Sequence, residues 1–132
     1  MWLPMPFSYT VYKEYGLVIS TGSGCVTWSE IKERQDQTKA DPNFDPGFSQ
    51  LVDLRAVTRF GMNGDQARML ARRMIFSFTT KRAFIATSPA IFGMARMWET
   101  FTELSQRPSQ IRVFYNLSSA LRWLGVRASP DE

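Results

Sequence analysis

The 132-residue sequence contains no histidine and only one cysteine, Cys25. Without an imidazole, the chain cannot form a Ser-His-Asp or Cys-His catalytic pair, and it cannot bind zinc through histidine. One cysteine excludes an internal disulfide and a cysteine-rich metal site. We therefore expect a protein that is not an enzyme and that holds neither a metal nor another cofactor.

Long apolar segments are also missing from the sequence. No stretch approaches the roughly 18 consecutive apolar residues that a membrane span needs, so we expect no transmembrane segment. Pro4 and Pro6 interrupt a short apolar run that has no basic flank, which is unlike a signal peptide. A free thiol suits a reducing compartment. Together these features predict a cytoplasmic protein.

Hydrophobic residues make up 44% of the sequence and aromatic residues 14%, so the chain can build a core and does not resemble a disordered protein. The length fits one domain. We expect this domain to occupy residues 7–125, with loosely ordered ends at residues 1–6 and 126–132.

Alternating aromatic and β-branched residues predict a strand over residues 7–14. The short turn at Tyr15-Gly16 joins it to a second strand over residues 17–21, which makes an antiparallel hairpin. We expect Gly22-Ser23-Gly24 to end the second strand. Apolar runs typical of buried strands follow at residues 48–54, 82–87 and 111–115.

Polar capping signals separate the later strands. Thr27 and Glu30 form a capping box, and the helix that it opens should stop by Ala40 because Asp41-Pro42 disfavours helical geometry. Beyond Ile31 this first helix is polar, so we expect it to lie on the surface.

Three more helices are predicted after it. Asn63 is the expected N-cap of a helix over residues 64–78. Pro89 suits the first position of a helix over residues 89–105, and a last helix ends before Gly125. The apolar stripe of the 64–78 helix comprises Ala67, Leu70, Ala71, Met74 and Phe78.

The element order is thus β-β-α-β-α-β-α-β-α, which predicts an α/β fold. Strands joined through a helix should be parallel, with right-handed connections. We expect a mostly parallel five-stranded sheet with an antiparallel edge hairpin and helices packed on the sheet.

Several short motifs, taken in order along the chain, resemble the bacterial SpoIIAA-like family over roughly residues 7–125. They are Thr27-x-x-Glu30, Asp41-Pro42-x-Phe44, Leu51-Val52-Asp53-Leu54-Arg55, Phe92-Gly93-Met94-Ala95-Arg96-Met97, Val113-Phe114 and Ala120-Leu121-x-Trp123-Leu124. Wider relatives of that family are the STAS domains, which include anti-sigma-factor antagonists, and more distantly the Sec14 lipid-binding domains. The resemblance implies a STAS-like α/β fold and brings no single activity with it.

In the anti-sigma-factor antagonists, the functional centre is an Asp-Ser-Ser-Gly turn whose serine is phosphorylated. This sequence reads Gly61-Met62-Asn63-Gly64 at the corresponding place if Gly64 matches the glycine of that motif. The phosphoacceptor position is then Asn63, so the resemblance implies no serine phosphoswitch at that position.

Basic residues are concentrated in residues 55–82, which hold seven Lys and Arg against one acidic residue, Asp65. Such a cluster suits an acidic protein partner or an anionic ligand, although Arg68 and Arg72 could also form an ordinary solvated helix face. We do not expect nucleic-acid binding, because the sequence has no groove-reading motif. The predicted partner-binding residues are Phe60, Gly61, Met62, Asn63, Gly64, Asp65, Arg68 and Arg72.

An apolar pocket is the alternative functional site. Aromatic and Met side chains at helical spacing could line it, as the Sec14 resemblance suggests, although this spacing is also typical of a core. The candidate pocket residues are Phe84, Phe92, Met94, Trp98 and Phe101. Phe92, Met97 or Trp123 could instead be exposed and mark a homodimer or partner surface. Asp53 and Asp65 are the best carboxylate pair for acid–base chemistry, and they have no metal-ligand companions.

We therefore predict a regulatory binding module that contacts a protein partner through the turn and basic helix that follow the third strand. A small-molecule or lipid-binding domain is the alternative.

Overall fold

The computed structural model describes residues 6–73, 80–104 and 110–126, which form one sheet and four α-helices. The order of the strands across the sheet equals their order along the chain, β1-β2-β3-β4-β5. The strands are β1 (Phe7–Tyr12), β2 (Leu17–Thr27), β3 (Ser49–Gly61), β4 (Lys81–Ile85) and β5 (Gln110–Phe114). The helices are α1 (Trp28–Ala40), α2 (Gly64–Arg72), α3 (Pro89–Leu104) and α4 (Leu117–Leu124).

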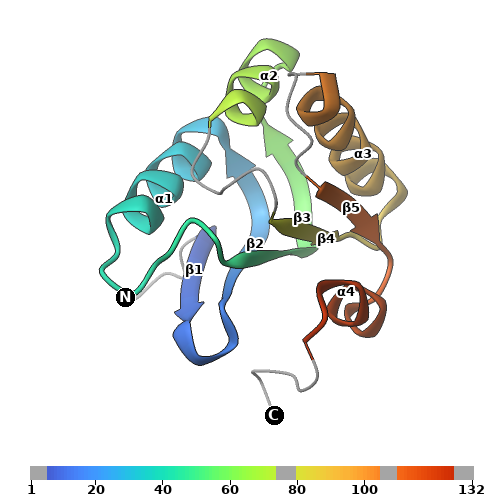
Figure 1. Cartoon of the computed structure of the whole chain (residues 1–132). Helices are drawn as coiled ribbons and strands as arrows, with labels where there is room; N and C mark the ends of the chain where they lie inside the picture. Colours follow the sequence, from blue (N-terminus) through green and yellow to red (C-terminus); the bar gives the residue numbers. More distant parts are fainter. Residues whose placement is uncertain (1–5, 74–79, 105–109, 127–132) are drawn as a thin grey trace, which may run out of the picture.

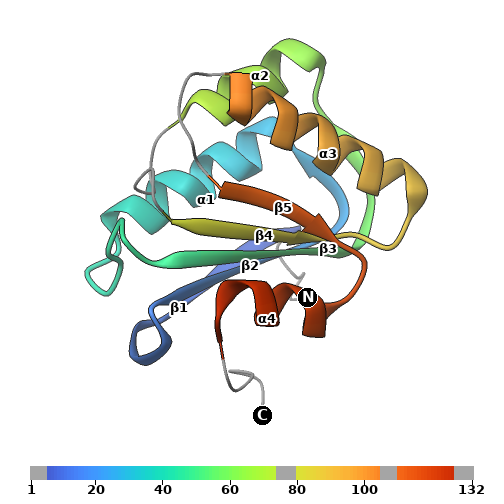
Figure 2. The same cartoon turned by 45° about the vertical axis from the view of Figure 1, so that its right-hand side comes forward.

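The pairing of the strands confirms the predicted mixed sheet. β1 and β2 are antiparallel, and every later neighbouring pair is parallel. Since the three parallel connections all step across the sheet in one direction, connections of the same hand place their helices on the same face. Figures 1 and 2 show this result, with α1, α2 and α3 on one face and α4 alone on the other.

Alternating side chains divide the core between the two faces of the sheet. Val52 and Phe84 belong to the cluster on the α1–α3 face, which also contains Trp98 of α3. Their chain neighbours Leu51 and Ile85 belong to the cluster on the other face, where α4 packs. This alternation is what a strand covered on both sides requires.

Two strands are longer than the sequence predicted. β2 continues through Gly22-Ser23-Gly24 to Thr27, and its register with β3 shifts on both sides of Ser23. The glycines form bulges and do not end the strand; Gly24 has a φ of +62°, which glycine adopts without strain. The lengthened β2 gives β3 a partner as far as Gly61, so the third strand continues beyond its predicted end at residue 54 through residues 55–61.

The first helix confirms its predicted cap but not its predicted position. Thr27 Oγ1 accepts a hydrogen bond from the backbone of Glu30 at 3.3 Å, and Glu30 Oε1 accepts one from the backbone of Thr27 at 3.2 Å. The helix is nevertheless not a surface helix, because Arg34, Gln35 and Thr38 are buried together with Ile31. Its inner face is polar.

The second helix is shorter than predicted. It ends at Arg72, and Arg73 has an extended backbone, with φ −73° and ψ 126°. Met74 and Phe78 of the predicted stripe lie outside the described residues, as does Ser105 at the predicted end of the third helix. Within the described part, Ala67 and Leu70 are buried, as an inward-facing stripe requires.

Candidate functional site

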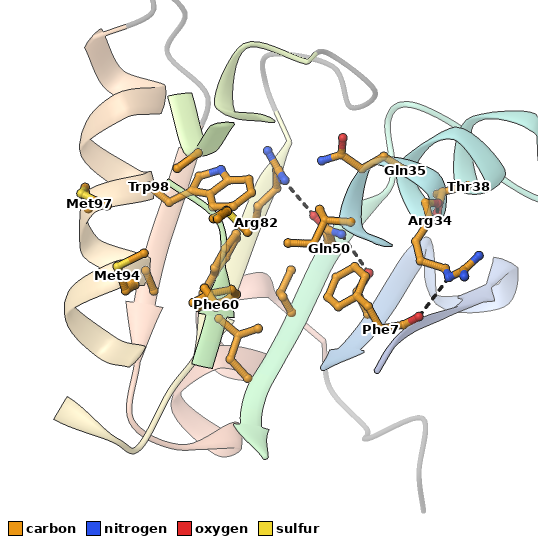
Figure 3. Close-up of a pocket in the computed structure, with 18 residues that line it drawn as sticks. Phe7, Arg34, Gln35, Thr38, Gln50, Phe60, Arg82, Met94, Met97 and Trp98 are labelled. Atoms are coloured by element: carbon orange, nitrogen blue, oxygen red, sulfur yellow. Dashed lines mark hydrogen bonds between the residues drawn. The ribbon is translucent and has the colours of Figure 1, made fainter. Parts of the chain in front are cut away.

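A pocket lies on the α1–α3 face of the sheet, between the inner faces of these helices and strands β2, β3 and β4 (Figure 3). One part of its wall is apolar and the other is polar. The apolar wall includes Phe60, Met62, Phe84, Met94, Met97 and Trp98. The polar wall consists of Ser20, Arg34, Gln35, Thr38, Gln50 and Arg82.

The register between β3 and β4 builds the centre of the polar wall. Gln50 and Arg82 are paired residues of these strands. Arg82 Nε donates a hydrogen bond to Gln50 Oε1 at 2.9 Å, and Gln50 Nε2 donates one to Ser20 Oγ at 3.0 Å. Burial lowers the pKa of Arg82 to about 10, so the guanidinium remains protonated at neutral pH. The wall therefore holds a positive charge inside the fold.

Arg34 brings a second guanidinium from α1. Its side chain is 9% exposed, and its Nε donates to the backbone oxygen of Phe7 at 3.0 Å (Figure 3). Glu33 Oε1 lies 3.7 Å from Arg34 Nη1, but the Glu33 side chain is 62% exposed, so this ion pair is strongly screened by solvent. Arg34 thus ties α1 to the edge strand β1 and also adds a positive charge to the pocket wall.

Two buried N–H donors of the pocket residues have no hydrogen-bond acceptor in the described part of the chain. They are Nε1 of Trp98 and Nη1 of Arg34. A buried donor without an acceptor costs about 1–3 kcal/mol, so native proteins rarely leave one in place without a reason. The Arg34 guanidinium is turned toward Phe7 and β1, whereas Trp98 borders the pocket, so its Nε1 is a donor that an oxygen-bearing ligand would satisfy (Figure 3).

The pocket is small. The space open to the centre of a water molecule is about 40 Å³. A single water needs about 10–15 Å³ on this measure, so the space holds about three waters. As it stands, the pocket is too small for the acyl chain of a lipid.

Three of the five predicted pocket residues line this space, namely Phe84, Met94 and Trp98. The other two lie elsewhere. The Phe92 ring stacks on Tyr115, with ring centroids 4.1 Å apart, and the Phe101 ring lies 5.1 Å from the guanidinium carbon of Arg68.

The polar wall was not predicted from the sequence. Gln50 and Arg82 are far apart in the chain, and only the strand register brings them together. A local signal was present in the first helix, where Arg34, Gln35 and Thr38 lie on one face at helical spacing. Because the helix is polar beyond Ile31, the same residues predict a surface helix instead.

The turn between β3 and α2 contains Asn63, which caps the helix. Asn63 Oδ1 accepts a hydrogen bond from the backbone of Gln66 at 2.8 Å, and Gln66 Oε1 accepts one from the backbone of Asn63 at 3.0 Å. Gly64 and Asp65 are exposed beside it, and Gly61 is half-buried. Phe60 and Met62 contribute to the pocket wall, so the turn is shared between the interior and the surface.

Helix α2 also carries an exposed surface, which continues onto α3. Arg68, Arg72, Phe101 and Leu104 line a shallow hollow there, and Met69 lies next to Arg68 in the chain. Met69 is 52% exposed and Leu104 is 78% exposed. Arg68 also forms an ion pair with Asp65, with Nη1 and Oδ1 3.2 Å apart. We call these five residues, Arg68, Met69, Arg72, Phe101 and Leu104, the α2–α3 surface.

The two predicted carboxylates are each paired with a nearby arginine. Burial alone would raise the pKa of Asp53, but two side-chain hydrogen bonds and one backbone hydrogen bond from Arg55, together with the charge of Arg55, lower that pKa below its usual value. Asp65 pairs with Arg68. Among the described residues, no group of three His, Cys, Asp or Glu side chains could hold a metal ion.

The side chains predicted from the sequence to mark a homodimer or partner surface are all half-buried. Phe92 packs on Tyr115, Met97 lines the pocket, and Trp123 packs against Phe114, with ring centroids 5.7 Å apart. Homodimerisation stays a prediction.

No protein-family model matches the sequence, and no curated protein matches it either. A search of solved structures finds an uncharacterized protein of the DUF3478 family from Shewanella loihica, which has a SpoIIAA-like fold. The TM-score is 0.57 at 15% sequence identity, and the match covers 94% of this chain and 98% of the other. The chain therefore has a SpoIIAA-like fold, as the sequence motifs implied. None of the described helices is long and apolar enough to cross a membrane.

Proposed function

We propose that this chain is a non-enzymatic binding domain whose pocket takes a small molecule with an apolar body. The observation that carries the proposal is the pocket under α1 and α3, with its wall of Phe, Met and Trp side chains. Binding pockets for small molecules combine such walls with a few polar groups that orient the ligand. The three Met side chains can change rotamer and adjust the space to a ligand.

The titratable residues of the pocket support binding over catalysis. The described residues that line it include two arginines and no Asp, Glu, Lys, Tyr or Cys. An arginine remains protonated at neutral pH and cannot serve as a general base there. Arginines do bind and orient charged groups, which is the role we assign to them.

The test is a fragment titration followed by NMR of methionine methyl groups. Aliphatic and aromatic fragments of about six to nine heavy atoms should bind with a Kd on the order of 1 mM, given the usual free energy per ligand atom. We expect the methyl signals of Met62, Met94 and Met97 to shift, while that of the exposed Met69 stays in place. Absence of any shift at the three pocket methionines would contradict the proposal.

A second candidate function is regulation of another protein through the β3–α2 turn and the α2–α3 surface. It is supported by the exposed Met69 and Leu104 beside the arginines Arg68 and Arg72, because an apolar patch edged with charge is typical of interaction sites. The partner surface would be acidic, to complement these arginines. The SpoIIAA-like fold is compatible with this role, and Asn63 leaves no hydroxyl at the turn position where the antagonists carry their phosphorylated serine.

For this second function, the Arg68→Glu/Arg72→Glu double variant is expected to lose its partner in a pull-down from cell lysate. Reversing two interface charges should weaken an interaction with an acidic surface at least about tenfold, since like charges then face each other. The matched control is Arg96→Glu/Arg122→Glu, which reverses two exposed charges on α3 and α4. Identical partner profiles for the wild type and both variants would speak against the second function.

A further inference from the structure

Two donor groups of the pocket, the Trp98 indole and the Arg82 guanidinium, lie beside the same aromatic ring, that of Phe84. The Phe84 ring lies 6.2 Å from the Trp98 indole, measured between centroids, and 6.0 Å from the guanidinium carbon of Arg82. Figure 3 shows Trp98 and Arg82 pointing toward the same space, with Gln50 below Arg82. An indole N–H and a guanidinium thus border the same part of the pocket.

The described residues that line the pocket carry a net positive charge. Arg34 and Arg82 contribute two positive charges, and the described residues that line the pocket include no carboxylate. The Gln50 oxygen that accepts from Arg82 is neutral. A carboxylate accepts a hydrogen bond from a guanidinium more strongly than a neutral amide does, and its two oxygens match the planar fork of arginine.

Trp98 supplies the second, independent observation. Its Nε1–H is buried and has no acceptor among the described residues. Because an indole N–H can only donate, a ligand that satisfies it must present an acceptor atom. A neutral hydrocarbon would leave the donor unsatisfied, whereas a carboxylate has enough lone pairs to accept from Trp98 and Arg82 together.

We propose that the ligand of this pocket is a small organic carboxylate, whose anionic group accepts hydrogen bonds from Arg82 and Trp98 Nε1 while its apolar body packs against Phe84 and Met94. The inference rests on the proposed small-molecule function and assigns the chemical class of the ligand. The limited space favours a body of a few carbon atoms or a single ring over a long chain.

The experiment compares carboxylates with amides of the same shape. The probes are butyrate with butyramide and benzoate with benzamide, added to the full chain at constant ionic strength and followed in ¹H–¹⁵N NMR spectra. The sequence has four tryptophans, and the indole signal that disappears in Trp98→Phe identifies Trp98. We expect this signal to shift on adding a carboxylate, with binding about tenfold tighter than that of the matching amide, because charged hydrogen bonds are the stronger ones.

Two variants separate the roles of the donors. Trp98→Phe keeps an aromatic ring and removes the N–H, and Arg82→Met keeps an unbranched side chain and removes the charge. Each should weaken carboxylate binding at least about fivefold and leave amide binding nearly unchanged. Arg96→Met is the control. It makes the same arginine-to-methionine change at a side chain on α3 that is 62% exposed, and this variant should bind both probes like the wild type.

The outcomes distinguish this inference from the proposed function. If the amides bind as tightly as the carboxylates and the Trp98 signal does not respond to charge, the carboxylate assignment is wrong while the small-molecule function stands. If neither type of probe, and no other fragment, binds in the pocket, both are wrong. If either pocket variant does not fold, the comparison of carboxylate and amide binding to the wild-type protein decides whether the inference holds.

Discussion

Replacing Ile85 with alanine is expected to lower the free energy of unfolding by about 3 kcal/mol, within the usual range of about 2–5 kcal/mol for truncating a buried isoleucine. Ile85 is fully buried at the end of β4, and it packs in the cluster under α4. The helices of the opposite face cannot fill the space that the truncation leaves, because the sheet lies between them and the cavity. The measurement is chemical denaturation of both proteins at 25 °C.

The control for this prediction is Ile85→Val, which removes one methylene group and should cost about 0.5–1.5 kcal/mol. A cost for Ile85→Ala below about 1 kcal/mol would mean that α4 does not cover this face of the sheet in solution. The pair therefore tests the position of α4 as well as the packing of one residue.

Replacing Gly22 with alanine is expected to lower the free energy of unfolding by about 1–3 kcal/mol, the usual cost of adding an atom to a filled core. A Cβ atom on Gly22 would lie only 2.7 Å from Cγ2 of Val57, which is itself buried, and 3.5 Å from the Phe7 ring. The Val57 side chain or the strands beside it must therefore shift. Since Phe7 also lines the pocket, the shift should weaken ligand binding as well.

Gly93→Ala provides the opposite control for Gly22→Ala. Gly93 lies in α3, and a Cβ atom there would meet no other heavy atom within 4 Å. Alanine is favoured over glycine in a helix, so this variant should gain about 0.5–1 kcal/mol of stability. Equal effects of the two substitutions in thermal or chemical denaturation would contradict the bulged path of β2 beside Val57.

Local signals in the sequence predicted the helices well at their amino ends. The capping boxes at Thr27 and Asn63 depend on residues three positions apart, and both are present in the structure. The order of strands and helices along the chain followed from the alternation of apolar runs with helices. These features are readable because the groups that make them are neighbours in the chain.

Features that depend on distant residues were not readable in the same way. Gly22-Ser23-Gly24 forms a bulge only because β3 lies alongside it, and without that partner the same residues suggest a turn. The polar wall of the pocket depends on the register of Gln50 with Arg82 and on which face of α1 turns inward. A single sequence gives the composition of α1 but not the direction in which its polar face points.

The pocket and the α2–α3 surface share one helix, α2. Ala67 of α2 lines the pocket, and its neighbour Arg68 belongs to the α2–α3 surface. Arg73, directly after the helix, donates to Gln35 Oε1 at 2.7 Å and forms an ion pair with Asp36, so it links α2 to the helix that carries Arg34. A ligand in the pocket and a partner outside it would therefore contact opposite sides of the same element.

The strands lie side by side in the sheet in the same order in which the ribosome synthesises them. Each strand that leaves the ribosome can join the exposed edge of the strands made before it, because none has to enter between two strands that are already paired. Helix α4 emerges after the last strand, so the face that it covers stays open to solvent until translation of the domain is almost complete. The apolar cluster of Leu51 and Ile85 on that face is therefore the last part of the core to be covered.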